Sequence, residues 1–527
     1  MTSPHAPFHP IIYVRGFAMT RGEIDATSAD PFCGFNLGST VYRATPDRKR
    51  PPRKYVFESP VIRLASDFGY RDVYEDGYDL LDKEWQDNPS NTLGSRSIVV
   101  YRYYDEASSL FGTSETPSIE TFATKLGELI LKVRELVCAN AANEIALDDF
   151  RCYLVAHSMG GLVSRAFLQN PKLDPKKAAR FVDKLFTYAT PHNGVDTIAG
   201  NVPGWLKFGD TDNFNRKRMS KYLALEEAFA KTERVDWLPE SRFPANRVFC
   251  MVGTNRQDYE AGLGLSRTFV GHGSDGLVRI DSATVVGIKA NGQPGEPCAK
   301  AFAYRAHSGI YGIVNSEEAY QNLARFLFGD VRVDIHAEFD DVRVPAELKK
   351  DDEKNKVDAL YQVELLASPR GKLWYLTRRT AEEDSVACFS HKEWNKSRKG
   401  IGKYLSTMFL ANRARVNQSR PSLAYSVTFG VRVPDYEVEK VLWFDKHYEG
   451  GYLFRNALVI ELVPPQNKDG EWHVKYAWQD QTVQSANKAV DTQELTKGRV
   501  EVTIPFDSGK DPGVTGRLRF VLSACNE

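Results

Sequence analysis

The chain has 527 residues, of which 42% are hydrophobic and 26% charged, an ordinary globular composition with room for two or more domains. Lys plus Arg and Asp plus Glu number 69 each, and this balance argues against nucleic acid or an anionic membrane as a long-range electrostatic partner. The seven cysteines show neither metal-ligand spacing nor the pattern of a disulfide framework, so no metal site is indicated.

Targeting signals are absent from the sequence pattern. The first 30 residues lack a basic start followed by an apolar stretch, as a secretory signal would have. No apolar run reaches the roughly 20 residues that a membrane-spanning helix needs. The sequence therefore predicts a cytoplasmic protein without a transmembrane segment, and export by another route is left open.

From about residue 10 to residue 329, short apolar runs alternate with stretches of helical spacing. The runs that read as buried strands are residues 11–14, 97–104, 151–156, 181–189, 247–252 and 301–304. Helices are predicted over 119–138, from 161 to 169, and after a cap at Asn315 or Ser316. This alternation predicts an α/β domain over residues 1–329, with a mostly parallel sheet covered by helices on both faces.

Two long stretches interrupt this alternation. Residues 20–94 are rich in Pro, Gly and charge, and we expect them to be irregular. Residues 195–245 carry large apolar side chains among polar ones: Trp205, Leu206, Phe208, Phe214 and Trp237. Long insertions in compact domains are often functional. The alternative is a structural insertion that packs against the sheet.

After Gly329 the hydrophobic period changes to two. Apolar and polar residues alternate over 331–339, 423–433 and 500–506, and 458–463 and 518–522 read as further strands. Alternating strands without intervening helices are typical of an antiparallel sandwich. The sequence thus predicts a β-rich, sandwich-like domain over residues 330–527.

The segment around Ser158 carries the strongest chemical signal. Ala156-His157-Ser158-Met159-Gly160 lies between an apolar strand and a helix. A serine on so sharp a turn takes a strained backbone conformation, and the residues two positions before and after it must be small for strand and helix to pass closely. The turn also places the hydroxyl at a helix N-terminus, where negative charge is favoured. A nucleophilic serine is the interpretation that this context supports, and a structural serine at a tight turn is the alternative.

Together with Tyr13-Val14-Arg15-Gly16-Phe17, this segment resembles the α/β-hydrolase superfamily, in particular its lipase-like serine esterases. The resemblance covers about residues 10–329 apart from the two insertions. It implies an oxyanion hole formed by the backbone N–H groups of Phe17 and Met159. Arg15 stands where the family usually has His. The segment Thr190-Pro191-His192-Asn193-Gly194 is similar to one that closes the next strand in many lipases, which makes His192 a structural residue.

The resemblance also implies an acid and a base, in the chain order Ser, Asp, His. Ser274-Asp275-Gly276-Leu277-Val278 resembles the lipase segment that carries the acid, so Asp275 is expected in that role, with Asp258 and Asp281 as alternatives. His307 follows a short strand and precedes the final helix, where the family has its catalytic histidine. His272 is its rival.

These residues predict a carboxylic ester hydrolase, an esterase or lipase, that works through a covalent acyl-enzyme and requires no cofactor. An ester or lipid is the expected substrate, and the insertion 195–245 would supply a lid or acyl-chain wall. One alternative is a phospholipase, including one that serves as an antibacterial effector, and another is a non-catalytic scaffold that binds lipid or protein. The C-terminal domain is a further candidate for lipid or protein contact, on fold analogy alone.

Overall fold

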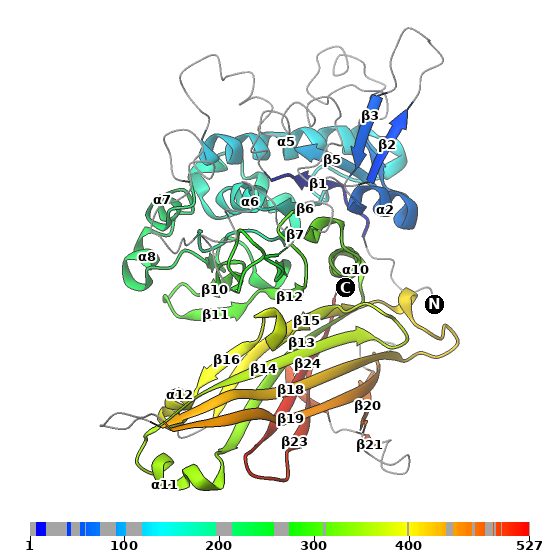
Figure 1. Ribbon diagram of the computed structural model, residues 1–527. Coiled ribbons are helices and arrows are strands. Elements are labelled where there is room, and N and C mark those ends of the chain that lie inside the picture. Colours follow the sequence, from blue (N-terminus) through cyan, green and yellow to red (C-terminus); the bar gives the residue numbers. More distant parts are fainter. Residues whose placement is uncertain are drawn as a thin grey trace. The chain divides into compact units, whose positions relative to one another are not determined.

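The computed structural model describes residues 7–16, 39–43, 53–57, 59–73, 91–101, 118–195, 213–257, 273–308, 312–397, 400–438, 446–465, 470–479, 488–489, 492–496 and 498–525 (Figure 1). The chain divides into two compact units. One comprises Pro7–Lys300 and Tyr304–Leu327, and the other consists mainly of Phe328–Glu527, with Ala301–Ala303.

The first unit is built on a seven-stranded sheet with the order β12-β9-β7-β6-β1-β5-β4. The pairings that join β4, β5, β1, β6, β7 and β9 are all parallel. Its strands are β1 (Ile11–Val14), β4 (Arg71–Asp72), β5 (Ser97–Tyr101), β6 (Cys152–His157), β7 (Val182–Tyr188), β9 (Val248–Gly253) and β12 (Ala299–Ala303). The mostly parallel α/β sheet predicted from the sequence is confirmed.

Helices cover both faces of this sheet. Among the described residues of the unit, the α-helices are α2 (Ser59–Phe68), α5 (Ile119–Ala139), α6 (Met159–Gln169), α7 (Arg216–Tyr222), α8 (Glu226–Thr232) and α10 (Glu317–Phe328). The apolar stripe of α5 and the buried α6 share one core with Ile12 and Leu154 of the central strands. On the opposite face, Phe326 of α10 packs against Phe249 with ring centroids 5.4 Å apart. Strand side chains alternate between the two faces, so each strand contributes to both cores.

The stretch 20–94, expected to be irregular, contains regular structure where the structure describes it. Helix α2 packs beside α10, because the Tyr320 hydroxyl donates to Asp67 at 2.7 Å and Arg63 pairs with Glu317 at 2.7 Å. Strand β4 adds to the edge of the parallel sheet by pairing with β5. Strands β2 (Ser39–Arg43) and β3 (Arg53–Phe57) form an antiparallel pair.

The second unit consists of two antiparallel sheets, which confirms the predicted β-rich C-terminal half. One has the order β17-β13-β24-β23-β22, and the other β15-β14-β18-β19-β20-β21 with β16 beside β14. The strands are β13 (Val331–Arg343), β14 (Val357–Pro369), β15 (Thr377–Arg379), β16 (Ala387–Ser390), β17 (Ile401–Leu410), β18 (Leu423–Val438), β19 (Lys446–Val463), β20 (His473–Trp478), β21 (Lys488–Ala489), β22 (Thr492–Thr496), β23 (Arg499–Asp507) and β24 (Gly513–Ala524).

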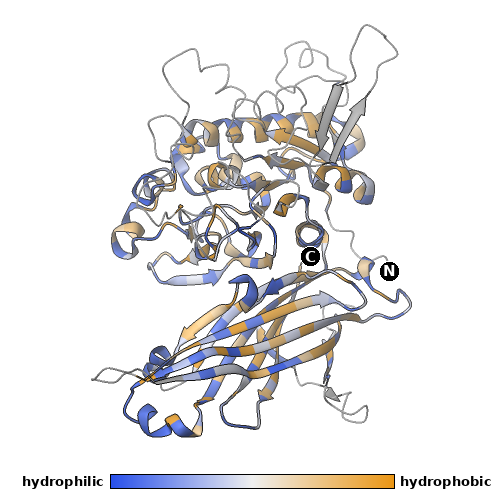
Figure 2. Ribbon diagram, in the orientation of Figure 1, coloured by the Kyte–Doolittle hydropathy of each residue, from blue (hydrophilic) through white to orange (hydrophobic). Residues whose placement is uncertain are grey.

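Both sheets contribute to one hydrophobic core, as the layers of a sandwich do. Hydrophobic and hydrophilic residues alternate along the long strands (Figure 2). In β18, for example, Val427 and Phe429 are fully buried, while Thr428 between them is partly exposed. The alternation that predicted strands from the sequence is therefore the alternation that fills this core.

Candidate active site

Ser158 joins β6 to α6 in a backbone conformation that L-residues rarely adopt. Its φ is 51° and its ψ is −124°. Such a conformation costs on the order of 1–3 kcal/mol and persists only where surrounding contacts impose it. Here the Ser158 N–H donates to the carbonyl oxygen of Tyr188 on β7 at 2.9 Å. The strained turn expected from the sequence is present at Ser158.

The small residues around Ser158 allow β1, β6 and α6 to meet. A Cβ atom at Gly160 would lie 2.2 Å from the carbonyl oxygen of Val14 and 2.5 Å from that of Arg15. Because both obstacles are backbone atoms, no side-chain movement could relieve the clash. Ala156, on the other side of the turn, is fully buried. The requirement for a small residue at Gly160 therefore comes from the end of β1, which lies against this position.

The structure brings Ser158, His307 and Asp275 into one hydrogen-bonded chain. Nε2 of His307 lies 2.9 Å from Oγ of Ser158, and Nδ1 of His307 lies 2.9 Å from Oδ2 of Asp275. His307 and Asp275 are each 1% exposed and Ser158 is 9% exposed, so Ser158 is the most exposed of the three residues. Because a carboxylate only accepts hydrogen bonds, the Nδ1–H of His307 donates to Asp275, and Nε2 faces the serine hydroxyl.

Backbone groups hold Asp275 in its orientation. The N–H groups of Leu277 and Val278 donate to Oδ1 of Asp275 at 3.0 and 2.7 Å. The N–H of His307 donates to the Asp275 carbonyl oxygen at 3.0 Å, which ties the two loops together. A Cβ atom at Gly253, the last residue of β9, would lie 2.8 Å from Cβ of Asp275, so the loop carrying Asp275 lies directly against the end of β9.

His157 is a site residue that the sequence argument did not single out. Its ring is fully buried, and its Nε2 lies 3.0 Å from the carbonyl oxygen of His307. Burial, with a smaller contribution from His307, lowers the pKa of His157 to about 3. The ring is therefore neutral at ordinary pH, and its Nε2–H donates to the carbonyl. The only sequence signal for this role was a histidine next to the nucleophile in an otherwise apolar strand.

The two expected oxyanion residues differ in how far the structure describes them. Met159 is the first residue of α6, so its N–H has no acceptor within the helix. Phe17 lies outside the described residues. The residue before it, Gly16, lies close to the nucleophile, because a Cβ atom there would be 3.3 Å from Cβ of Ser158 and 2.9 Å from Nδ1 of His157.

The alternative candidates for the acid and the base either have other surroundings or lie outside the described residues. Asp258 and His272 lie outside the described residues. Asp281 is exposed in a short 3-10 helix. His192 is fully buried, with Nε2 3.1 Å from Oγ1 of Thr187, and burial holds its pKa well below the usual range.

The insertion 195–245 is partly described. Trp205, Leu206 and Phe208 lie outside the described residues. Phe214 and Trp237 are half-buried and pack against the main core of the unit, and the Trp237 indole N–H donates to Thr232 at 3.0 Å. The described part therefore behaves as a packed element, and a lid function for the remainder stays a prediction.

Arg165 anchors that packed element to α6. Its side chain is fully buried and donates to four oxygens, those of the Gln169 side chain and of the His192, Val235 and Trp237 carbonyls, at 2.8–3.0 Å. Burial lowers the pKa of Arg165 to about 10, so the group stays charged. The sequence signal for this buried role was a single arginine in the apolar stretch 161–168, and the sequence analysis did not single it out.

In the described parts of the chain, no group of three His, Cys, Asp or Glu side chains could hold a metal ion, and no helix is long and apolar enough to cross a membrane.

Comparisons with known proteins found only distant likenesses. No family model and no curated protein matches the chain. Among solved structures, the mature Bacillus licheniformis lipase BlEst2 is 14% identical, with 40% of this chain and 75% of that chain covered and a TM-score of 0.25. Phospholipase PlaB from Legionella pneumophila in complex with thio-NAD is 12% identical, with 84% and 89% covered and a TM-score of 0.31. Likenesses this weak carry no argument about activity.

Proposed function

We propose that the chain is a serine carboxylic ester hydrolase, an esterase or lipase, in which Ser158 is the nucleophile. The observation that carries the proposal is the hydrogen-bonded chain of Ser158, His307 and Asp275 at a strained strand-to-helix turn. A histidine Nε2 within 2.9 Å of a serine hydroxyl, oriented by a buried carboxylate, is the arrangement that activates a serine for acyl transfer.

The reaction follows from these contacts. Nε2 of His307 takes the proton of Ser158 as Oγ attacks the ester carbonyl carbon, and Asp275 stabilises the resulting imidazolium. The oxyanion forms beside the start of α6, where the Met159 N–H, the helix dipole and, on the sequence argument, the Phe17 N–H stabilise it. Each such donor contributes about 3–4 kcal/mol. The imidazolium protonates the leaving alcohol, and water activated by His307 then hydrolyses the acyl-enzyme.

The test combines covalent labelling with turnover. A fluorophosphonate probe should label the full chain once, and p-nitrophenyl esters should be hydrolysed. Ser158→Ala should abolish both while leaving the melting temperature nearly unchanged. Ser164→Ala is the matched control, because Ser164 lies on the same helix and its hydroxyl donates to the Gly160 carbonyl oxygen.

The proposal is wrong if Ser158→Ala retains more than about one per cent of the activity, or if Ser164→Ala is equally inactive. A panel of esters with graded acyl chains, extended to triglyceride and phosphatidylcholine, then separates a simple esterase from a lipase and from a phospholipase.

A further inference from the structure

Two neighbouring loops of the C-terminal unit expose apolar side chains. Leu373, in the β14–β15 connection, is 103% exposed, and Val416, in the β17–β18 connection, is 61% exposed. The loops are adjacent, because a Cβ atom at Gly371 would lie 3.7 Å from Cγ1 of Val416. The N–H of Arg370 also donates to the carbonyl oxygen of Ala424, at the start of β18. We call residues 370–375 and 411–422 the tip loops.

The charged side chains of the tip loops all have one sign. Residues 370–375 contain Arg370 and Lys372, residues 411–422 contain Arg413, Arg415 and Arg420, and neither range contains Asp or Glu. Glu461 of β19 approaches Arg370 at 3.7 Å. Asp330 accepts a hydrogen bond from the Asn412 N–H at 2.6 Å. In a chain with zero net charge, the tip loops thus contribute five cations and two exposed apolar side chains, with the carboxylates of Glu461 and Asp330 beside them.

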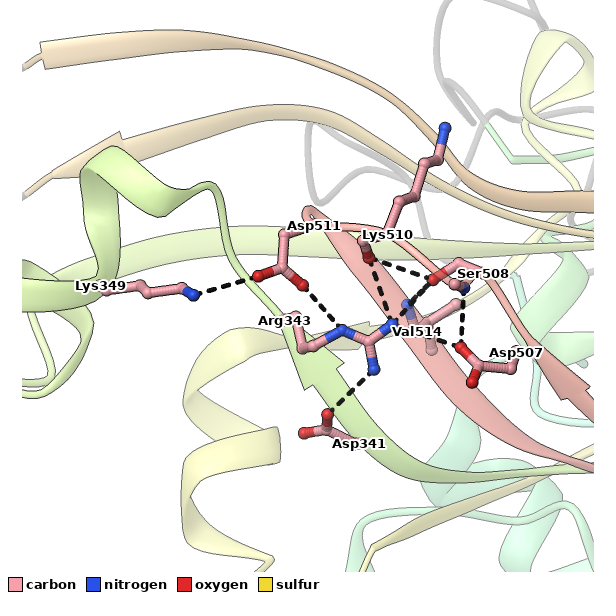
Figure 3. Close-up of polar contacts among 9 residues, drawn as sticks. Asp341, Arg343, Lys349, Asp507, Ser508, Lys510, Asp511 and Val514 are labelled. Carbon is pink, nitrogen blue, oxygen red and sulfur yellow. Dashed lines mark hydrogen bonds and ion pairs between the residues drawn. The ribbon is translucent and has the colours of Figure 1, made fainter.

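Strand β13 begins beside the tip loops, where Val331 pairs with Leu410, and its other end is built differently. Arg343 lies among Asp341, Asp507 and Asp511, and Lys349 also pairs with Asp511 (Figure 3). Because β13 has 13 residues, its two ends are about 40 Å apart. The cluster at this end of β13 contains both cations and carboxylates, whereas all charged side chains within the tip loops are cations.

We propose that the tip loops dock the protein on an anionic phospholipid surface. Leu373 and Val416 would enter the interfacial layer while the surrounding Lys and Arg side chains meet lipid phosphates. Half-buried Trp374 packs against the sandwich core, which holds the loop next to Leu373 in place. Two loops with two exposed apolar side chains suit a bilayer surface better than a protein partner, because a stable protein interface needs about 800 Å² on each side.

The attraction is expected to be short-ranged. Because the whole chain has no net charge, only cations within a Debye length of the surface contribute, about 8 Å at physiological salt. The test is co-sedimentation of the Ser158→Ala protein with lipid vesicles, because this variant removes hydrolysis from the measurement. The vesicles contain phosphatidylcholine alone or phosphatidylcholine with about 30% phosphatidylglycerol. We expect binding to the anionic vesicles, weakened by salt, and little binding to phosphatidylcholine alone.

Variants locate the contact. Leu373→Ser with Val416→Ser should lower the partition coefficient at least about 10-fold. Lys372→Gln with Arg420→Gln should lower it about 5-fold per charge and flatten the salt dependence. Two controls should bind as before. Leu147→Ser removes a half-exposed leucine of the first unit, and Lys350→Gln removes an exposed cation beyond the far end of β14.

Thermal melts should be the same for all variants, because the changed side chains are exposed. The proposal is overturned if anionic vesicles do not bind the protein. It is also overturned if the tip-loop variants bind as well as the controls, which would mean that lipid contacts another part of the chain. Because binding is measured without hydrolysis, neither result depends on the proposed esterase activity.

Discussion

Nε2 of His157 donates a hydrogen bond to the carbonyl oxygen of His307, 150 positions later in the chain, at 3.0 Å. The residue that precedes the nucleophile therefore holds the backbone of the residue proposed as the base. Because a misplacement of about 1 Å can cost about 100-fold in rate, this bond bears directly on the geometry between Ser158 and His307.

His157→Phe should lower kcat about 10- to 100-fold with little change in KM, because it removes the donor to His307 while filling the space. His157→Gln keeps an amide donor at about the same distance from the backbone, and should restore most of kcat. Ester kinetics of both variants are the measurement. If the Phe and Gln variants lose the same activity and melt at the same lower temperature, His157 only fills space.

The acid is tested by comparing carboxylates. Asp275→Asn should lower kcat by up to about 10⁴-fold, because the imidazolium loses its counter-charge and the tautomer of His307 is no longer fixed. Asp281→Asn is the matched control and should remain active, since Asp281 is exposed. An inactive Asp258→Asn beside an active Asp275→Asn would assign the acid to Asp258.

The strain at Ser158 predicts an unusual order of stability. Because its φ is positive, Ser158→Gly should unfold with a free energy about 1 kcal/mol higher than Ser158→Ala, although both are inactive. At Ser164, inside α6, the order should reverse, since Gly is about 1 kcal/mol worse than Ala in a helix interior. Urea unfolding of the four variants measures both differences. The same order at both positions would contradict a strained turn.

We expect the aromatic residues of the insertion 195–245 to fall into two groups, one that stabilises the fold and one that contacts the acyl chain of the substrate. Trp237 packs against the core, so Trp237→Ala should lower the melting temperature and reduce kcat/KM for all esters in the same proportion. If Trp205 belongs to an acyl-chain wall, Trp205→Ala should affect long-chain esters most, since each buried CH₂ contributes about 0.8 kcal/mol. A chain-length series on both variants decides this. A uniform loss in Trp205→Ala would end the lid hypothesis.

Acid should destabilise the fold through its buried neutral histidines. The pKa of His157 is lowered to about 3 and that of His192 well below the usual range, whereas in the unfolded chain both titrate near 6.5. Below about pH 6.5 the unfolded chain binds protons that the folded chain does not. The free energy of unfolding therefore decreases as the pH is lowered, by up to about 1.4 kcal/mol per histidine per pH unit.

Urea unfolding of the wild type and His157→Gln at pH 7 and pH 5 measures this effect. The variant should lose about 2 kcal/mol less than the wild type over that interval, because the proton that His157 takes up on unfolding no longer contributes. Equal losses in both proteins would show that His157 is not neutral in the fold.

Local sequence determined the elements whose cause is local. Strand β1 occupies the apolar run Ile11–Val14, as predicted, and α5 spans Ile119–Ala139, close to the predicted 119–138. The turn at Ser158 was predictable because its requirement for small neighbours at Ala156 and Gly160 acts within five residues. Hydrophobic period and steric size are properties of short windows, and a single sequence shows them directly.

Tertiary structure decided what depends on segments far apart in the chain. Strand β4 at Arg71–Asp72 has no apolar run of its own and exists through its pairing with β5. The sequence offered three carboxylates for the acid, and only the fold brings Asp275 beside His307. The acceptors of Arg165 and the bond from His157 to His307 likewise join distant segments. Such contacts depend on where the whole chain places each loop, and local composition carries no record of that placement.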